Sequence, residues 1–252
     1  MSEVTPGPRS SVFTTMRFSR NGGIFLLREH LDRIQSHADK LRIDAKSIDL
    51  NSILDVLQTY PPELDEGLVR IELTKSLEFN VVYRPFSIQN EIVDAVALAS
   101  PLWPKRIAGT KHGAWDAYID ARQQAETRGA DLALLVHEYC IVDADRCTPL
   151  ILDEDGVVWV SDSDLAVQSI TFEALKSHLI NAGYHIQRGN LNERLVARCA
   201  EAVAVGSGVG VVGIDSVDGE DIGDERSPLF EFCKSILEQQ YGEPNNWTEV
   251  WK

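Results

Sequence analysis

Residues 109–150, GTKHGAWDAYIDARQQAETRGADLALLVHEYCIVDADRCTPL, decide the fold that the sequence predicts. Lys111 precedes a run with helical spacing, and Gly129 separates that run from an apolar segment typical of a strand. Asp143 lies on a second strand-like segment, 32 residues after Lys111. The stretch therefore places an amine and a carboxylate on neighbouring rigid elements, which suits a cofactor that needs both.

The composition is that of an acidic globular protein. The 252 residues are 44% hydrophobic and 25% charged, with a formal net charge of -15 and a sequence pI of about 4.8. A negative field repels phosphate backbones and anionic lipids. We therefore expect no nucleic acid and no membrane among the partners.

The cysteines and the N-terminus favour the cytoplasm. The four cysteines form no CxxC pair, which is typical of reduced thiols. The N-terminus lacks a basic-plus-apolar signal, and no apolar run approaches the ~18 residues of a membrane span. We expect a cytoplasmic protein.

The first half of the chain predicts a small α+β unit. Strands are expected over residues 12–18, 24–27, 68–73, 79–83 and from 92 to 98, and helices over 28–41 and 47–58. Residues 99–110 contain Pro101, Pro104 and Gly109, which is typical of a linker. We therefore expect a smaller N-terminal α+β domain, residues 1–104, and a larger C-terminal domain, residues 105–252, that carries Lys111.

The second half alternates helical and strand patterns. Helices are expected over residues 115–128, 169–181, 191–199 and 229–241, and strands over 132–136, 140–142, 150–152, 157–160, 203–205 and 209–214. This alternation favours a mixed α/β domain.

Several segments together resemble the class IV aminotransferase family, the fold-type IV pyridoxal-phosphate enzymes. In chain order they are FTTMR, FLLREHLDRIQSHADKL, LVRIEL, GTKHG, GADLALLV, QSITFEAL and AVGSGVGVVGIDSVDG. The resemblance covers roughly residues 12–223. It implies an α/β (α+β) fold like that of D-amino-acid aminotransferase, with a barrel-like sheet in the C-terminal domain. It also implies pyridoxal 5'-phosphate between two domains, a small amino substrate and a homodimer.

The resemblance gives Lys111 and Asp143 their roles. Lys111 matches the Schiff-base lysine, and that chemistry needs an amine that can be neutral, as burial beside cations permits. Asp143 falls where the family has a glutamate against the pyridine nitrogen, and its side chain is shorter by ~1.5 Å, one carbon–carbon bond. Considered as an isolated residue, Lys111 would be a solvated lysine beside His112 in a turn, and the ordered series of segments is what favours the catalytic role.

The resemblance also implies a phosphate site. Arg33 matches the arginine of the family's helix motif, and a guanidinium can bind phosphate oxygens through two hydrogen bonds. The amides of Ile170 and Thr171 open a helix and suit an anion, and Ser207 falls where the family has a threonine hydroxyl. We expect these four to converge on one phosphate. Without the resemblance, Arg33 is a helix-surface arginine and Ser169 a simple N-cap.

Three departures from the family pattern bear on the reaction. Thr148-Pro149 replaces an asparagine and an apolar residue, and Phe172 replaces an arginine. These changes predict an apolar or aromatic amino substrate, unless Arg70 or Arg106 reaches inward. The short chain and FTTMR favour a 4-amino-4-deoxychorismate lyase, which releases pyruvate and leaves 4-aminobenzoate. The alternatives are a branched-chain or D-amino-acid transaminase, and an inactive member used for binding or assembly.

Other motifs point to no further site. The glycines of residues 206–213 resemble a dinucleotide-binding loop, but that loop should open a helix, whereas here a strand is expected. The six histidines show no metal-ligand spacing, so we expect no metal, and we place them at the surface or at helix ends.

Overall fold

The computed structural model describes residues 7–86, 90–223 and 228–251. The chain forms two compact units. The first contains Met1–Phe86, Pro104–Trp115 and Tyr241–Lys252, and the second contains Ser87–Trp103 and Asp116–Gln240. Lys111 thus packs with the N-terminal part of the chain. The two units are defined by packing contacts, whereas the expected domains are divided at one position along the sequence. The boundary between domains at residue 104 therefore stays a prediction.

A five-stranded sheet forms the centre of the first unit. Its order is β15-β2-β1-β3-β4, and the strands are β1 (Ser11–Ser19), β2 (Gly23–Phe25), β3 (Glu66–Thr74), β4 (Phe79–Arg84) and β15 (Trp247–Thr248). All neighbouring strands are antiparallel. The alternation of Val69, Ile71 and Leu73 with Arg70 and Glu72 is confirmed, because the three apolar residues are buried and the charged ones are not.

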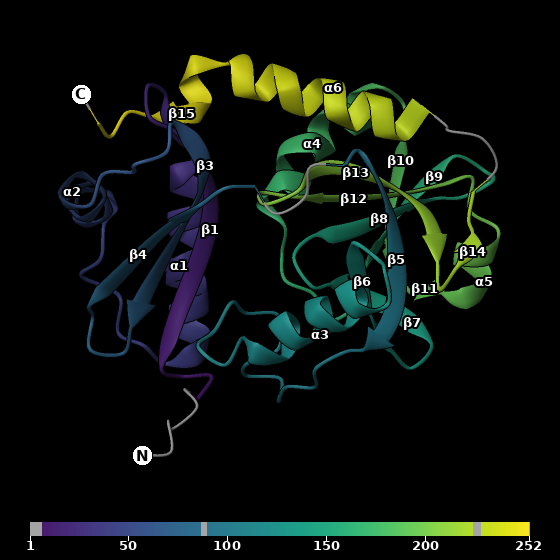
Figure 1. The fold of residues 1–252 in the computed structure, drawn as a ribbon, viewed down its shortest axis with the longest axis horizontal. Helices are drawn as coiled ribbons and strands as arrows, with labels where there is room; N and C mark the ends of the chain where they lie inside the picture. The colour runs from purple at the N-terminus through teal and green to yellow at the C-terminus, as the bar shows by residue number, and fades with distance from the viewer. Residues whose placement is uncertain (1–6, 87–89, 224–227, 252) are drawn as a thin grey trace. The chain divides into compact units, whose positions relative to one another are not determined.

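Helix α1 (Leu27–Leu41) packs along β1 on this sheet (Figure 1). Leu31, Ile34, Ala38 and Leu41 form its buried stripe, as the periodicity predicts. The strand expected over residues 24–27 is shorter. It ends at Phe25, because Leu26 adopts a left-handed conformation with φ 50° and the helix begins at the next residue.

Two further segments complete the first unit. Helix α2 (Leu50–Thr59) begins three residues later than expected, because Asp49 caps it by accepting a hydrogen bond from the Ser52 amide. A 3-10 turn, η1 (Pro244–Asn246), leads into β15, which pairs with β2. The tail strand lies outside the elements that the sequence predicts.

A mixed, strongly curved sheet forms the second unit. Its order is β10-β9-β8-β12-β13-β5-β6-β7-β11, with β14 paired to β13. The strands are β5 (Ile92–Ala99), β6 (Leu132–His137), β7 (Cys140–Ala144), β8 (Thr148–Leu152), β9 (Val157–Ser161), β10 (His185–Gly189), β11 (Leu191–Asn192), β12 (Glu201–Gly206), β13 (Gly210–Val217) and β14 (Glu220–Asp221). Strands β7 and β11 also contact β9, which is near the other edge. The sheet is therefore nearly closed, and the expected barrel-like α/β fold is confirmed.

The helices of this region are α3 (Asp116–Thr127), α4 (Ile170–Asn181), α5 (Glu193–Ala197) and α6 (Pro228–Gly242). The helix expected over residues 191–199 is wrong at both ends, because Leu191 pairs with Ile141 at the sheet edge and Asn192 caps a helix of five residues. Strand β10 was not predicted, since its residues are mostly polar. No helix in the described part of the chain is long and apolar enough to cross a membrane.

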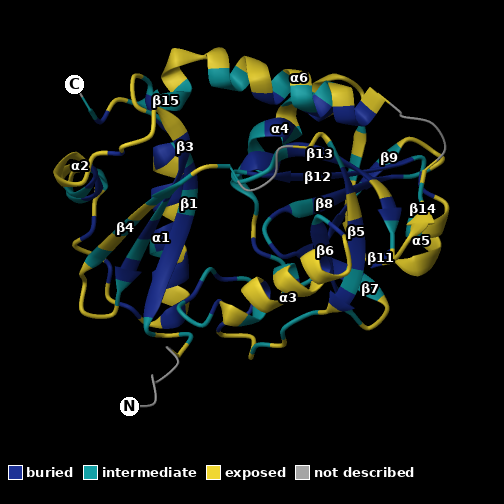
Figure 2. Cartoon of the chain, in the orientation of Figure 1, coloured by how far each residue is buried: buried dark blue, intermediate teal, exposed yellow. Residues whose placement is uncertain are grey.

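Aliphatic side chains fill most of the core of the second unit. Leu132, Leu134, Ile151, Ala204 and Val212 are each at most 1% exposed. Figure 2 shows these strands as buried, whereas much of α3 is exposed. The strands therefore provide a rigid frame for Asp143 on β7, for the turn that carries Ser207 and for the start of α4.

Candidate active site

The segment around Lys111 pairs with the start of β1 in the first unit. The Phe13 amide donates to the Lys111 carbonyl at 3.2 Å, and the Gly113 amide donates to the Ser11 carbonyl at 3.0 Å. A Cβ on Gly113 would lie 2.1 Å from Ser10 Oγ and 2.8 Å from Ser11 Oγ, so a larger residue would require both hydroxyls to move. Backbone pairing therefore fixes the lysine at the edge of the sheet.

The Lys111 side chain lies among aromatic rings of the same unit. Its Nζ is 5.3 Å from the centroid of Phe13 and 4.8 Å from that of Trp115. The two rings meet edge to face at 4.9 Å. The Arg70 guanidinium lies 3.6 Å from the centroid of the Phe13 ring. Its Nη2 also forms an ion pair with Glu72 Oε2 at 3.6 Å. Two cations therefore share one aromatic side chain.

Arg33 lies in a hydrogen-bonded group with Thr14 and His30. Its Nη2 donates to Thr14 Oγ1 at 2.7 Å and lies 3.3 Å from His30 Nδ1. Thr14 Oγ1 lies 2.6 Å from the same imidazole nitrogen. Burial lowers the pKa of Arg33 to about 10, so the guanidinium stays charged at neutral pH. The first unit therefore holds a positive charge in a partly desolvated position, which suits an anion.

Three histidines near this group are buried, which corrects the expectation that they lie at the surface. His30, His37 and His112 are at most 7% exposed. Burial, followed by the charges of Arg33 and Lys111, lowers the pKa of His30 well below its usual value and that of His37 to about 3. Burial lowers the pKa of His112 to about 4. All three imidazoles are therefore neutral at physiological pH.

Asp143 lies on β7 of the second unit, 6% exposed. Its Oδ1 accepts a hydrogen bond from the Ala144 amide at 3.0 Å, and its Oδ2 accepts one from the Val167 amide at 2.9 Å. Val167 stands three residues before Ile170, so Asp143 holds the loop that leads into α4.

The start of α4 and the β12–β13 turn carry the other predicted phosphate ligands. Ser169 caps α4 by accepting a hydrogen bond from the Phe172 amide at 3.2 Å. Helix geometry gives the amides of Ile170 and Thr171 no partner within the helix. Ser207 lies half-buried in the turn between β12 and β13. Both features belong to the second unit, as Asp143 does.

The departures from the family pattern occupy ordinary structural positions. Thr148 opens β8, and Pro149 stands opposite Ala204 of β12. Phe172 is 1% exposed, and the Arg188 guanidinium lies 5.8 Å from its ring. Arg106 is exposed, whereas Arg70 is half-buried on Phe13. Of the two arginines considered from the sequence, Arg70 therefore lies near Lys111.

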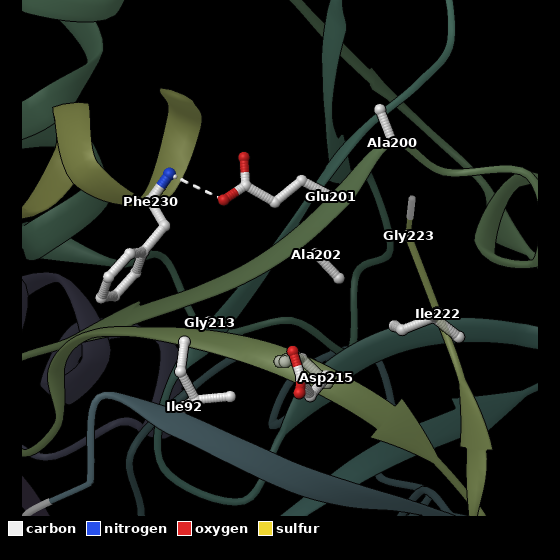
Figure 3. Close-up of a pocket in the computed structure, with 10 residues that line it drawn as sticks. Ile92, Ala200, Glu201, Ala202, Gly213, Asp215, Ile222, Gly223 and Phe230 are labelled. Atoms are coloured by element: carbon white, nitrogen blue, oxygen red, sulfur yellow. Dashed lines mark hydrogen bonds between the residues drawn. The ribbon is translucent and has the colours of Figure 1, made fainter. Parts of the chain in front are cut away.

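A small pocket of the second unit includes none of the predicted site residues in its lining (Figure 3). It measures about 90 Å³. Glu201 at its edge accepts hydrogen bonds from the amides of Leu229 and Phe230, both at 3.0 Å. The carboxylate thereby caps the first turn of α6, so we assign it a structural role.

The structure thus brings the predicted residues into two groups. Arg33 and Lys111 belong to the first unit, and their charges both act on His30 and His37. Asp143, Ile170, Thr171 and Ser207 belong to the second. Convergence of both groups on one phosphate stays a prediction. The sequence interpretation missed the surroundings of Lys111, namely Phe13, Thr14, His30, His37 and Trp115.

The comparisons with known proteins give a family and a fold. The family model for amino-transferase class IV matches residues 11–217. No curated protein sequence gives a significant match. Many solved structures are similar, and the three described next are 16% to 18% identical to this chain, which shows the fold alone.

Three solved structures illustrate the likeness. A provisionally named 4-amino-4-deoxychorismate lyase from Legionella pneumophila has a TM-score of 0.80 and 18% identity, covering 94% of this chain and 97% of that one. The branched-chain aminotransferase of Thermoproteus uzoniensis with norvaline has a TM-score of 0.80 and 16% identity, with coverages of 96% and 91%. The T.th. branched-chain amino acid aminotransferase complexed with N-(5'-phosphopyridoxyl)-L-glutamate has a TM-score of 0.78 and 18% identity, with coverages of 96% and 90%.

Proposed function

Because the chain belongs to the class IV aminotransferase family, we propose that it is a pyridoxal-phosphate enzyme that acts on a small amino substrate through Lys111. The observation that carries the proposal is the position of this lysine. It is fixed by backbone pairing to β1, and its charge and that of Arg33 both act on the buried histidines. We further propose that the enzyme is a cytoplasmic homodimer, as is typical of the family.

The residues present fit the cofactor. Arg33 keeps its charge although it is largely desolvated, which suits a phosphate. Arg33 would hold that phosphate together with Ser207 and the first-turn amides of Ile170 and Thr171. Asp143 would bind the protonated ring nitrogen. Lys111 would bind the aldehyde carbon.

When bound, pyridoxal phosphate supplies an electron sink for the charge left at the substrate's α-carbon. The protein's part is to provide and position a base. The Lys111 amine would serve as that base, taking the proton from the substrate's α-carbon and holding it at Nζ.

Of the two reactions in the family, we propose the lyase, which forms pyruvate and 4-aminobenzoate from 4-amino-4-deoxychorismate. Arg70 is compatible with this choice, since it shares the Phe13 ring with Lys111 and can pair with a substrate carboxylate, which 4-amino-4-deoxychorismate and amino acids both carry. The likeness in length to the Legionella pneumophila protein agrees with it. Arg70 also weakens the expectation of a purely apolar substrate, which depended on this arginine not reaching inward.

Two alternatives follow from other observations. Branched-chain aminotransferases are equally similar in fold, so transamination of an amino acid is the second candidate. An inactive member is the third, because both oxygens of the shorter Asp143 already accept backbone amides.

A side-by-side assay distinguishes these functions. Purified protein is tested with 4-amino-4-deoxychorismate and with a panel of amino acids plus 2-oxoglutarate. Pyruvate release from the first alone supports the lyase, whereas keto-acid formation from the panel supports the transaminase. Lys111→Ala should abolish either activity, and Lys46→Ala, an exposed lysine of the same unit, should leave it unchanged. Cofactor binding without turnover would support the inactive member, and Asp143→Glu is then the variant that should recover activity.

A further inference from the structure

One face of α1 contacts the loop that leads to Lys111. Arg33, His37 and Lys40 are spaced i, i+4 and i+7, which places them on one side of the helix. His37 Nδ1 accepts a hydrogen bond from the Lys111 amide at 3.1 Å. Lys40 Nζ donates to the Ala108 carbonyl at 2.6 Å. Two side chains of α1 therefore bind the backbone of this loop three residues apart.

The loop itself has little regular structure. Its internal hydrogen bonds are short turns, from the amides of Ile107 and Ala108 to the Pro104 carbonyl and from the Thr110 amide to the Ile107 carbonyl. Ile107, Ala108 and Thr110 are nonetheless buried. A buried loop without strand or helix pairing depends on side chains to fix its backbone. Here α1 supplies them on one side, and β1 pairs with the Lys111 carbonyl through the Phe13 amide.

We propose that His37 and Lys40 are positioning residues for Lys111, which hold its main chain between α1 and β1 and so direct the amine toward the reacting carbon. This inference rests on the proposed function of Lys111. It adds two residues that contact neither substrate nor cofactor in the proposed site. They act through the backbone of the lysine loop.

The hydrogen bond to Lys111 requires a neutral His37. A protonated imidazole donates from both nitrogens, so it could not accept from the Lys111 amide. The charged and titratable groups that act on His37 are Arg33, Lys111, Lys40 and His112, and each disfavours the protonated form. Burial first, and then the same cations that suit an anionic ligand, therefore keep His37 in the neutral state that binds the loop.

Variants of α1 test the positioning role. His37→Leu removes the acceptor, His37→Asn keeps an acceptor oxygen near the position of Nδ1, and Lys40→Met keeps the length of the side chain without its charge. Gln35→Leu is the matched control, because Gln35 Nε2 donates to the Ile48 carbonyl at 2.8 Å and so binds a different loop from the same helix.

The first measurement is amide hydrogen exchange at Lys111 in the full chain without added cofactor. Loss of one hydrogen bond of about 1 kcal/mol should speed exchange about fivefold in His37→Leu. Gln35→Leu should leave the rate at this amide unchanged, and His37→Asn should restore much of the protection. Equal exchange in His37→Leu and Gln35→Leu would overturn the contact, whatever the enzyme catalyses.

The second measurement is the rate at which pyridoxal phosphate and borohydride label Lys111. We expect His37→Leu and Lys40→Met to be labelled several-fold more slowly than wild type, with Gln35→Leu near wild type and His37→Asn between them. Slower labelling in the control alone, or equal labelling in all four variants, would overturn the positioning role. If wild type itself is not labelled at Lys111, the proposed function fails, and the exchange experiment still decides the contact.

Discussion

The two compact units bury different kinds of titratable side chain. The first buries three imidazoles, His30, His37 and His112, beside the cations of Arg33 and Lys111. Among its described residues, the second buries three carboxylates, Asp143, Asp145 and Glu201, each of which accepts hydrogen bonds from backbone amides. One unit therefore combines neutral bases with positive charge, and the other places negative charge on a rigid frame.

This difference agrees with the proposed function. Pyridoxal phosphate needs cationic and hydrogen-bonding groups at its phosphate and an acid at its ring nitrogen. Arg33 of the first unit suits the phosphate, and Asp143 of the second suits the nitrogen. If this comparison is right, substitutions in the two units should lower the free energy of unfolding by different amounts, and these losses should depend differently on pH.

The largest effect on stability is expected from the second unit. Asp145, whose side chain is fully buried, accepts from Arg122 Nε at 3.2 Å and from Arg146 Nη1 at 2.9 Å. Asp145→Ala leaves both guanidiniums without this carboxylate, so the free energy of unfolding should fall by about 3–5 kcal/mol. Urea unfolding measures it. Glu154→Ala breaks the exposed pair with Arg198 and should cost less than about 1 kcal/mol. Similar losses in both variants would contradict the buried role of Asp145.

The next effect concerns the tail strand of the first unit. A Cβ on Gly23 would lie 1.9 Å from the Thr248 carbonyl oxygen, and the residue has φ +95°. Gly23→Ala must therefore separate β2 from β15, at a cost of about 3 kcal/mol. Gly156→Ala in the second unit has a similar φ of +81° and nothing within 4 Å, so only about 1 kcal/mol of backbone strain is expected. Equal unfolding midpoints for the two variants would show that β15 does not pair as described.

A smaller effect should appear as a pH dependence. The pKa of His37 falls from its ordinary 6.5 to about 3 on folding, so protonation favours the unfolded chain. Its contribution to stability is complete above pH 6.5 and is lost progressively as the pH falls toward 3. At pH 5 the loss should be about 2 kcal/mol. Comparing the free energies of unfolding of wild type and His37→Asn at pH 7.5 and 5.0 measures it. An unchanged pH dependence in the variant would contradict a neutral, buried His37.

Much of the fold could be predicted from the sequence, because the apolar residues of most helices and strands recur with a clear period. The two-residue alternation around Ile71 and the stripe through Ile34 were sufficient for β3 and α1. The polar strand β10 and the tail strand β15 could not be found in this way. Residues 185–189 carry no apolar alternation, and β15 exists because it pairs with β2, far away in sequence.

The candidate site was less predictable than the fold. Lys111 and Arg33 came from the resemblance, and their surroundings were missed. His30 and His37 lie seven residues apart, with the same spacing as the buried Ile34 and Leu41, so the helical period did place them near the buried face. The expectation of surface histidines overlooked this signal. The contact from His37 to the Lys111 amide joins residues 74 positions apart, which no local pattern reveals.

Chemical labelling of Lys111 tests the central claim most directly. Purified protein is incubated with pyridoxal phosphate, reduced with borohydride, digested and analysed by mass spectrometry. We predict a yellow protein and a phosphopyridoxyl group on the peptide that contains Lys111. A protein that stays colourless with added cofactor, or a label on another lysine only, would contradict the assignment.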